Sequence, residues 1–175
     1  MSRSLPEPDR AQRGIAPDAL RQVCAQFSTG VAIATVLGQD GRPCGLTINS
    51  FTSVSASPPL ILICIDYRCS LLAHFRASSW FGVNILGRSQ QDLSSRFALF
   101  DGNRFEAVAW TNGEFTGVPL IENAIGTMEC CVSQVVEAGD HAVLFAEVVA
   151  AECAGGDPLI YYGSGYRRLE PGKKG

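Results

Sequence analysis

The stretch Gly45–Leu60 reads GLTINSFTSVSASPPL, and it carries six serine or threonine hydroxyls and one asparagine among apolar residues, with no charge. Its first half alternates, because Leu46 and Ile48 point to one side of an extended chain and the threonine and asparagine point to the other. We therefore predict a strand over Cys44–Ser50. A half-exposed strand accounts for this pattern, and so does the wall of a pocket for a polar, planar ligand, so the residues alone leave both interpretations open.

The next segment, Leu60–Asp66, reads LILICID and is apolar on both faces, which predicts a central buried strand. Hairpin signals such as Gly139-Asp140 join the remaining strands, without the regular strand–helix alternation of a parallel sheet. We therefore predict a mostly β or α+β fold, an antiparallel barrel with short peripheral helices. The other predicted strands are Val31–Leu37, Trp80–Leu86, Ala124–Glu137 and His141–Glu152. The predicted helices are Ala16–Ser28, Ser70–Arg76 and Ser89–Phe97, and Phe100–Pro119 is predicted to be irregular.

The composition describes a globular protein, with 46% hydrophobic and 18% charged residues over a length of 175. We expect a single domain over residues 16–170, with flexible tails at residues 1–15 and 171–175. The net charge of −3 without a basic cluster argues against nucleic acid as a partner. The longest apolar runs are too short to cross a bilayer, and the polar start shows no signal peptide, so we expect no membrane association.

Seven cysteines make an odd count without paired C-x-x-C spacing. Most lie inside apolar stretches, where cysteine behaves as a small hydrophobic residue. This usage predicts reduced thiols in a cytoplasmic protein and no metal site.

The chain has only two histidines, which limits the catalytic arrangements that are available. The G-x-S-x-G motif of many serine hydrolases is absent, and so are the glycine-rich motifs G-x-G-x-x-G and G-x-x-x-x-G-K-[ST] that hold nucleotides. His141 begins a predicted strand after a hairpin, at a barrel rim; a ligand contact and an ordinary turn-flanking residue explain that position equally well. His74 is more typical of a surface or interface histidine.

Three segments in order resemble the flavin reductase-like family of FMN-binding split-barrel proteins. They are FSTGVAIATV (27–36) with GLTINSFTSVSASPPLILICID, WFGVNIL with QQDLSSRFA (80–98), and GDHAVLFAEV (139–148) with PLIYYGSGYRRL. The resemblance covers about residues 16–170. It implies a Greek-key split barrel, a homodimer with flavin near the interface, and hydride transfer from NADH or NADPH to FMN or FAD. It also implies that reduced flavin reaches a partner flavin-dependent monooxygenase.

The resemblance assigns three sets of site residues by motif. The flavin-binding set is Pro43, Cys44, Gly45, Leu46, Thr47, Asn49, Ser50, Cys64, Ile65, Asp66, Tyr67, Arg68, Cys69, Ser70, Arg96, Phe97 and Ala98, with the phosphate held by the segment from Cys64 to Ser70. The nicotinamide-binding set is His141, Tyr161, Tyr162, Gly163, Ser164 and Tyr166. His141 is the expected catalytic position, where it orients the nicotinamide nucleotide.

Two alternative functions accompany this interpretation. The first is a flavoprotein that keeps its FMN as an electron carrier or sensor. The second is the related split-barrel type that oxidises a small substrate such as pyridoxamine phosphate, and the hydroxyl-rich string with the G-D-H hairpin fits it less well.

Overall fold

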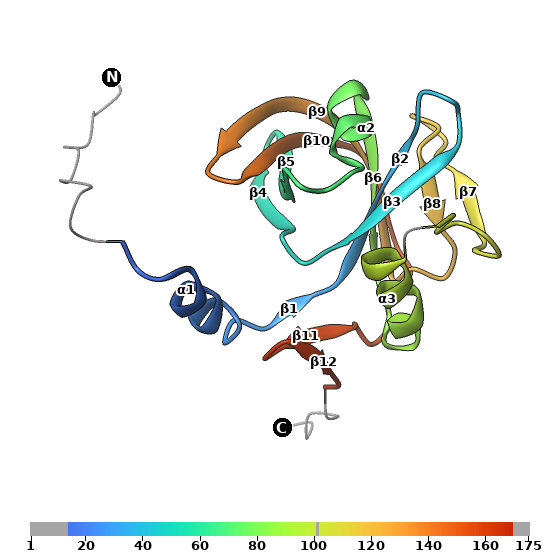
Figure 1. Cartoon of the computed structure of the whole chain (residues 1–175). Coiled ribbons are helices and arrows are strands. Elements are labelled where there is room, and N and C mark those ends of the chain that lie inside the picture. Colours follow the sequence, from blue (N-terminus) through green and yellow to red (C-terminus); the bar gives the residue numbers. More distant parts are fainter. Residues whose placement is uncertain (1–13, 101, 170–175) are drawn as a thin grey trace.

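A seven-stranded antiparallel sheet forms the body of the computed structural model, which describes residues 14–100 and 102–169. Each strand pairs with its neighbours in antiparallel register, and the sheet curls strongly along its length (Figure 1). In spatial order the strands are β3 (Pro43–Ile48), β2 (Ala32–Leu37), β6 (Trp80–Ile85), β9 (Gly126–Ala138), β10 (His141–Cys153), β5 (Pro59–Asp66) and β4 (Thr52–Ala56). The predicted mostly β, antiparallel architecture is confirmed.

The predicted barrel does not close. Within the described residues, the two edge strands β3 and β4 do not pair with each other, so the sheet stays open. β4 pairs with β5 only as far as Leu62, and the next backbone groups of β5 bond to a side chain. Ser50 Oγ donates to the Cys64 carbonyl (2.9 Å) and accepts from the Cys64 N–H (3.1 Å). The Ser50 hydroxyl thus continues the contact with β5 beyond the end of the β4–β5 ladder.

Two hydrophobic clusters stabilise this sheet. The larger one lies inside the curl, where β5 contributes Ile61, Ile63 and Ile65 and the short helix α2 (Leu72–Ala77) contributes Phe75. The smaller one lies beneath helix α3 (Gln91–Leu99), which follows the 3-10 turn η1 (Arg88–Gln90), and includes the fully buried Phe97. β5 buries alternate residues, and it lies one strand from the sheet edge instead of at the centre.

The helix α1 (Pro17–Cys24) is shorter than predicted and has no buried residue. Its apolar residues face solvent, with exposed fractions of 51% for Leu20 and 70% for Val23. After the helix, the chain turns to form β1 (Thr29–Gly30), and Figure 1 shows α1 standing apart from the large sheet. The predicted apolar stripe is therefore present on α1, but the large sheet of the same chain does not cover it.

Two small sheets complete the fold. β1 pairs with β11 (Ile160–Tyr162), which pairs with β12 (Gly165–Arg167), and β7 (Trp110–Asn112) pairs with β8 (Pro119–Ile121). A buried polar network fixes β8 to the large sheet, because the Asn84 amide accepts from the Ile121 N–H (2.7 Å) and donates to the Ile33 carbonyl (3.0 Å). Residues 1–13 and 170–175, which hold nearly all of the two predicted tails, lie outside the described residues.

Candidate functional site

The edge strand β3 carries the start of the hydroxyl-rich stretch, and one cavity opens near each end of this strand. The cavity at its start, which we call the arginine cavity, has a volume of about 620 Å³. The cavity at its end, which we call the hydroxyl cavity, has a volume of about 390 Å³. Together they make β3 the centre of the candidate site.

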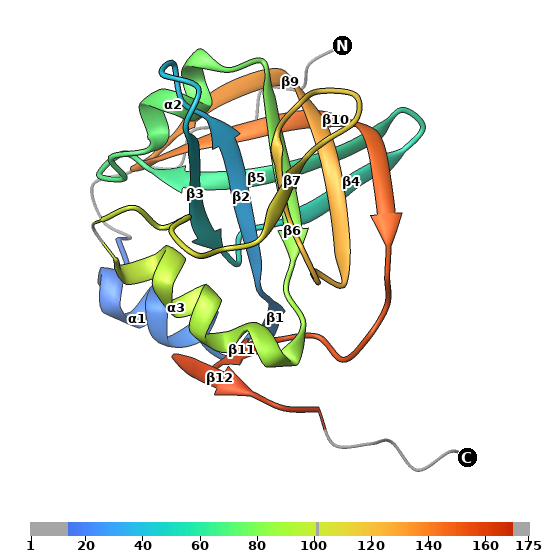
Figure 2. The same cartoon turned by 90° about the vertical axis from the view of Figure 1, so that its right-hand side faces the viewer.

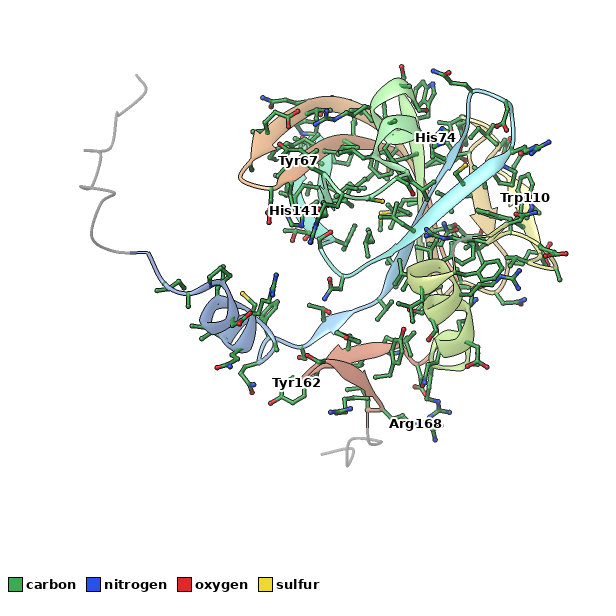
Figure 3. All side chains as sticks on the ribbon, viewed as in Figure 1. Tyr67, His74, Trp110, His141, Tyr162 and Arg168 are labelled. Carbon is green, nitrogen blue, oxygen red and sulfur yellow. The ribbon has the colours of Figure 1, made fainter. Side chains whose placement is uncertain are left out.

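The arginine cavity combines predicted flavin residues with cationic and aromatic side chains. β3 contributes residues 43–45 and the turn before α2 contributes Ser70, while His74 and Trp110, labelled in Figure 3, come from α2 and β7. Arg104 supplies a fixed positive charge, because its Nε donates to the Phe100 carbonyl (2.7 Å) and its Nη1 donates to the Gly45 carbonyl (3.0 Å). Such a guanidinium beside open space suits a phosphate group.

Two contacts hold β3 against α3. Gly45 leaves room for the Phe97 ring, since a Cβ at this glycine would lie 2.9 Å from that ring and 3.1 Å from the Ala34 carbonyl oxygen. Thr47 Oγ1 donates to the Ser94 carbonyl (2.7 Å). These contacts bring together two of the predicted flavin-binding segments, residues 43–50 and 96–98. Phe97 itself is fully buried in the core.

The hydroxyl cavity brings the predicted flavin residues next to part of the predicted nicotinamide set. Thr47 and Asn49 line it from the end of β3, and Ala98 lines it from α3. The β11–β12 hairpin closes the other side with Tyr161, Ser164 and Tyr166. The Tyr166 hydroxyl lies 2.8 Å from Ser94 Oγ, and the Tyr166 ring meets the Tyr161 ring edge-on at a centroid distance of 5.5 Å. Residues from three distant segments thus share one cavity.

The loop predicted to hold the phosphate contains its own ion pair. Arg68 donates to both carboxylate oxygens of Asp66, with its shortest contact at 2.6 Å, and this bond holds the pKa of Asp66 far below its usual range. Tyr67 donates to Glu137, which also accepts from Arg76 at 2.6 Å. In the described structure, Ser70 is the residue of this loop that lines the arginine cavity.

His141 begins β10 opposite Asp66 of β5 and lies outside both cavities. Its Nδ1 is 2.6 Å from Asp140 Oδ1, and this contact lowers the pKa of Asp140. Figure 3 shows the half-buried His141 in the region of Tyr67 and away from Tyr162. Within one chain, the structure therefore separates His141 from the nicotinamide residues of the β11–β12 hairpin.

Sequence reasoning missed several residues that line the two cavities. Arg104 and Trp110 fall in the segment Phe100–Pro119, which was expected to be irregular and carried no motif. Ser94 belongs to the string QQDLSSRFA, but its motif assigned only residues 96–98 to the flavin. Arg96, which was assigned, donates to the Asn103 carbonyl (3.2 Å) and lies over the Phe100 ring, outside both cavities.

The described part of the chain shows neither a metal-binding cluster nor a membrane-spanning helix. Across residues 14–100 and 102–169, no three or more histidine, cysteine, aspartate or glutamate side chains gather where they could bind a metal ion. No helix in these ranges is both long and apolar enough to cross a bilayer. All seven cysteines are free thiols, and burial raises the pKa of Cys130 to about 12.

The amino-acid sequence is similar to those of known flavin reductases. The chain is 37% identical over 150 residues to a probable flavin reductase of Rhizobium meliloti (strain 1021), covering 86% of this chain and 48% of that protein. It is 37% identical over 157 residues to an NADH-dependent FAD reductase of Streptomyces globisporus, covering 87% of this chain and 85% of that protein. The chain thus spans about half the length of the first relative and most of the second.

A solved structure agrees with the sequence matches. The Streptomyces globisporus C-1027 NADH:FAD oxidoreductase SgcE6, in complex with NAD and FAD fragments, superposes with a TM-score of 0.84 at 36% identity, covering 91% of this chain and 98% of that one. The profile of the flavin reductase like domain matches residues 24–170, which include β3, both cavities and the β11–β12 hairpin. This chain therefore belongs to the flavin reductase-like family.

Proposed function

We propose that this chain transfers hydride from NADH or NADPH to FMN or FAD and supplies reduced flavin to a partner flavin-dependent monooxygenase. The observation that carries the proposal is the hydroxyl cavity, where Thr47 and Asn49 face Tyr161 and Tyr166. Flavin and nicotinamide must meet face to face for hydride transfer, and this cavity joins the segments expected to bind each of them. The names of the related NADH-dependent FAD reductase and SgcE6 support the same reaction.

The residues along β3 fit a flavin, which has a planar ring with a polar edge and a phosphate at the end of a flexible chain. Pro43 and Asn49 are six residues apart, about 20 Å along an extended strand. The arginine cavity offers the Arg104 guanidinium and the Ser70 hydroxyl to a phosphate at one end of this path. The hydroxyl cavity offers uncharged polar groups to the ring at the other end.

Backbone groups of β3 provide further donors for the ring. The Gly45 carbonyl accepts from Arg104, so it faces away from β2, the strand with which β3 pairs. Backbone groups alternate in direction along a strand, so the N–H of Thr47 faces the same open edge. An edge-strand N–H can donate to the carbonyl edge of a flavin and stabilise the negative charge of the reduced ring.

The chemistry requires no acid or base from this chain. Bound flavin supplies the hydride acceptor and the nicotinamide supplies the donor. The protein's contribution is to align the two: Thr47 and Asn49 bind on the flavin side, and Tyr161 and Tyr166 form the wall on the nicotinamide side. Among the described residues, the lining of the hydroxyl cavity includes no charged side chain, cysteine or histidine, which suits a flavin that dissociates after reduction.

A direct assay tests the proposed function. Purified protein is mixed with NADH or NADPH and FMN, FAD or riboflavin in air, and the absorbance of the reduced nicotinamide is followed. We expect the consumption of NADH or NADPH to require both the protein and the added flavin. The reaction continues because oxygen reoxidises the reduced flavin that the protein releases. No consumption with any of the six combinations would rule out the reductase function.

We also propose that the working unit is a homodimer of the Greek-key split-barrel type in the cytoplasm. Three features support a site that is completed by a second copy of the chain. The apolar residues of α1 are exposed, the large sheet is open, and His141 lies apart from the β11–β12 hairpin. The seven free thiols support the cytoplasmic location. Sedimentation at assay concentrations is expected to give twice the mass of the chain, and a monodisperse monomer would contradict the dimer.

A further inference from the structure

Ser94 of α3 is fully buried, and it contacts both sides of the hydroxyl cavity. Its side-chain oxygen lies 2.8 Å from the Tyr166 hydroxyl of β12, and its carbonyl accepts the hydrogen bond from Thr47 Oγ1 at 2.7 Å. Figure 2 shows α3 lying between β3 and the β11–β12 hairpin, so this one residue joins the two elements. The flavin assignments did not include Ser94.

The hairpin that carries Tyr166 has few other polar contacts in the described structure. β11 and β12 are three residues long each, and β11 pairs with a strand of two residues, β1. At the hairpin tip, the Gly163 N–H donates to the Ala25 carbonyl (2.9 Å) and the Tyr162 hydroxyl donates to Gln26 (2.9 Å), so both bonds lead to the segment after α1. Towards α3, Ser95 Oγ reaches the Tyr166 hydroxyl only at 3.5 Å. Tyr166 also packs against the hydrophobic cluster that includes Phe97 of α3, and Ser94 adds the shortest polar contact between Tyr166 and that helix.

We propose that Ser94 is a positioning residue that sets the nicotinamide side of the site at a fixed distance from the flavin side. Its hydroxyl holds Tyr166 against α3, and its carbonyl holds Thr47 against the same helix turn. Either hydroxyl can donate in this bond, and in both cases the contact holds Tyr166 as a wall of the cavity. This inference rests on the proposed function, because it assigns the two sides of the cavity to flavin and nicotinamide.

The consequence for catalysis follows from the geometry of hydride transfer. The reacting atoms must approach to about 3–3.5 Å, and small displacements of a bound ring lower the rate strongly. Losing the Ser94 hydroxyl frees the Tyr166 wall, while the carbonyl that binds Thr47 is a backbone group and stays. We therefore expect a change in the binding of the nicotinamide and in hydride transfer, with little change in the binding of flavin.

Two single variants and their combination test this inference. In Ser94→Ala and Tyr166→Phe, the loss of one buried hydrogen bond is expected to raise the KM for NADH about five- to tenfold and to lower kcat, with the flavin KM within about twofold. Both changes remove the same bond, so the double variant should show no larger effect than the stronger single variant. Ser133→Ala is the matched control, since Ser133 also bonds to a backbone carbonyl (3.2 Å) but lies on the exposed part of β9.

Three results would overturn the inference: an unchanged NADH KM in both single variants, equal increases in the NADH and flavin KM values, or effects that multiply in the double variant. If Ser94→Ala fails to fold, as shown by its urea unfolding curve, Tyr166→Phe alone carries the test because Tyr166 is only half-buried. The wild-type assay separates the two proposals. An inactive wild type contradicts the proposed function, whereas an active wild type with unaffected variants contradicts only the role of Ser94.

Discussion

Replacing Arg104 with methionine is expected to raise the KM for FMN about ten- to hundredfold and to leave the KM for riboflavin within about twofold. Arg104 is the cation that two backbone carbonyls hold at the edge of the arginine cavity, beside the start of β3. A hydrogen bond to a charged group contributes about 1.5–3 kcal/mol, and each 1.4 kcal/mol corresponds to about a tenfold change in affinity. Riboflavin has no phosphate, so it loses nothing with the guanidinium.

The riboflavin comparison separates binding from structure. If Arg104 only braces the loop after α3, its removal will disturb β3 and raise both KM values by similar factors, which would contradict a phosphate site in the arginine cavity. Arg88→Met provides the matched control, because Arg88 forms an exposed ion pair with Asp157 (3.2 Å) and lines neither cavity. Its KM values for both flavins should match those of the wild type.

Replacing His141 with alanine is expected to raise the KM for NADH about five- to tenfold, far more than the KM for FMN. Asp140 engages Nδ1 of the imidazole at 2.6 Å and so orients the ring, which leaves Nε2 as the nitrogen for a ligand. Loss of one hydrogen bond to a nicotinamide nucleotide accounts for an effect of this size. Steady-state kinetics with each substrate varied in turn provide the measurement.

The His141 variant also bears on whether a second copy of the chain completes the nicotinamide site. His141 lies apart from the β11–β12 hairpin within one chain, so its effect on NADH is expected to depend on the dimer. Glu147→Ala, an exposed position on the same strand, should leave both KM values unchanged. Equal increases for NADH and FMN in the His141 variant would show that the histidine does not belong to the nicotinamide side.

Local patterns predicted most of the sheet because its strands are bounded by turns that the residues specify. The hairpin at Gly139-Asp140 is an example, since Gly139 has a φ of 63° and joins β9 to β10 where the sequence predicted. Alternation placed β3 correctly, and the structure adds that it is an edge strand. The openness of the sheet was not predictable, because local patterns do not say whether the two edge strands β3 and β4 will pair with each other.

The predicted helix Ala16–Ser28 shows what an amphipathic pattern leaves undetermined. Its apolar residues recur at helical spacing, but the pattern does not say which surface covers them, and no residue of α1 is buried in the described part of the chain. The segment after Cys24 instead follows long-range contacts, with β1 pairing to β11. Helix propensity within a few residues could not anticipate a partner strand from the other end of the chain.

The candidate site was predictable where the sequence motif itself contains the residues that line a cavity. Gly45 and Thr47 lie along one edge strand and Asn49 directly follows it, and Thr47 and Asn49 line the hydroxyl cavity. Arg104 was not predictable, because its position depends on two carbonyls in separate segments. The burial of Phe97 has a similar origin: the ring fills the space left by Gly45, which the motif alone does not reveal.

Anaerobic mixing of the protein with equal amounts of NADH and FMN or FAD tests the central claim most directly. The visible absorbance of the flavin should bleach as the nicotinamide is oxidised, with one flavin reduced for each NADH consumed, and gel filtration should then separate reduced flavin from the protein. Flavin that stays oxidised would contradict hydride transfer by this chain. Flavin that is reduced but stays bound would contradict the proposal that this chain supplies reduced flavin to a monooxygenase.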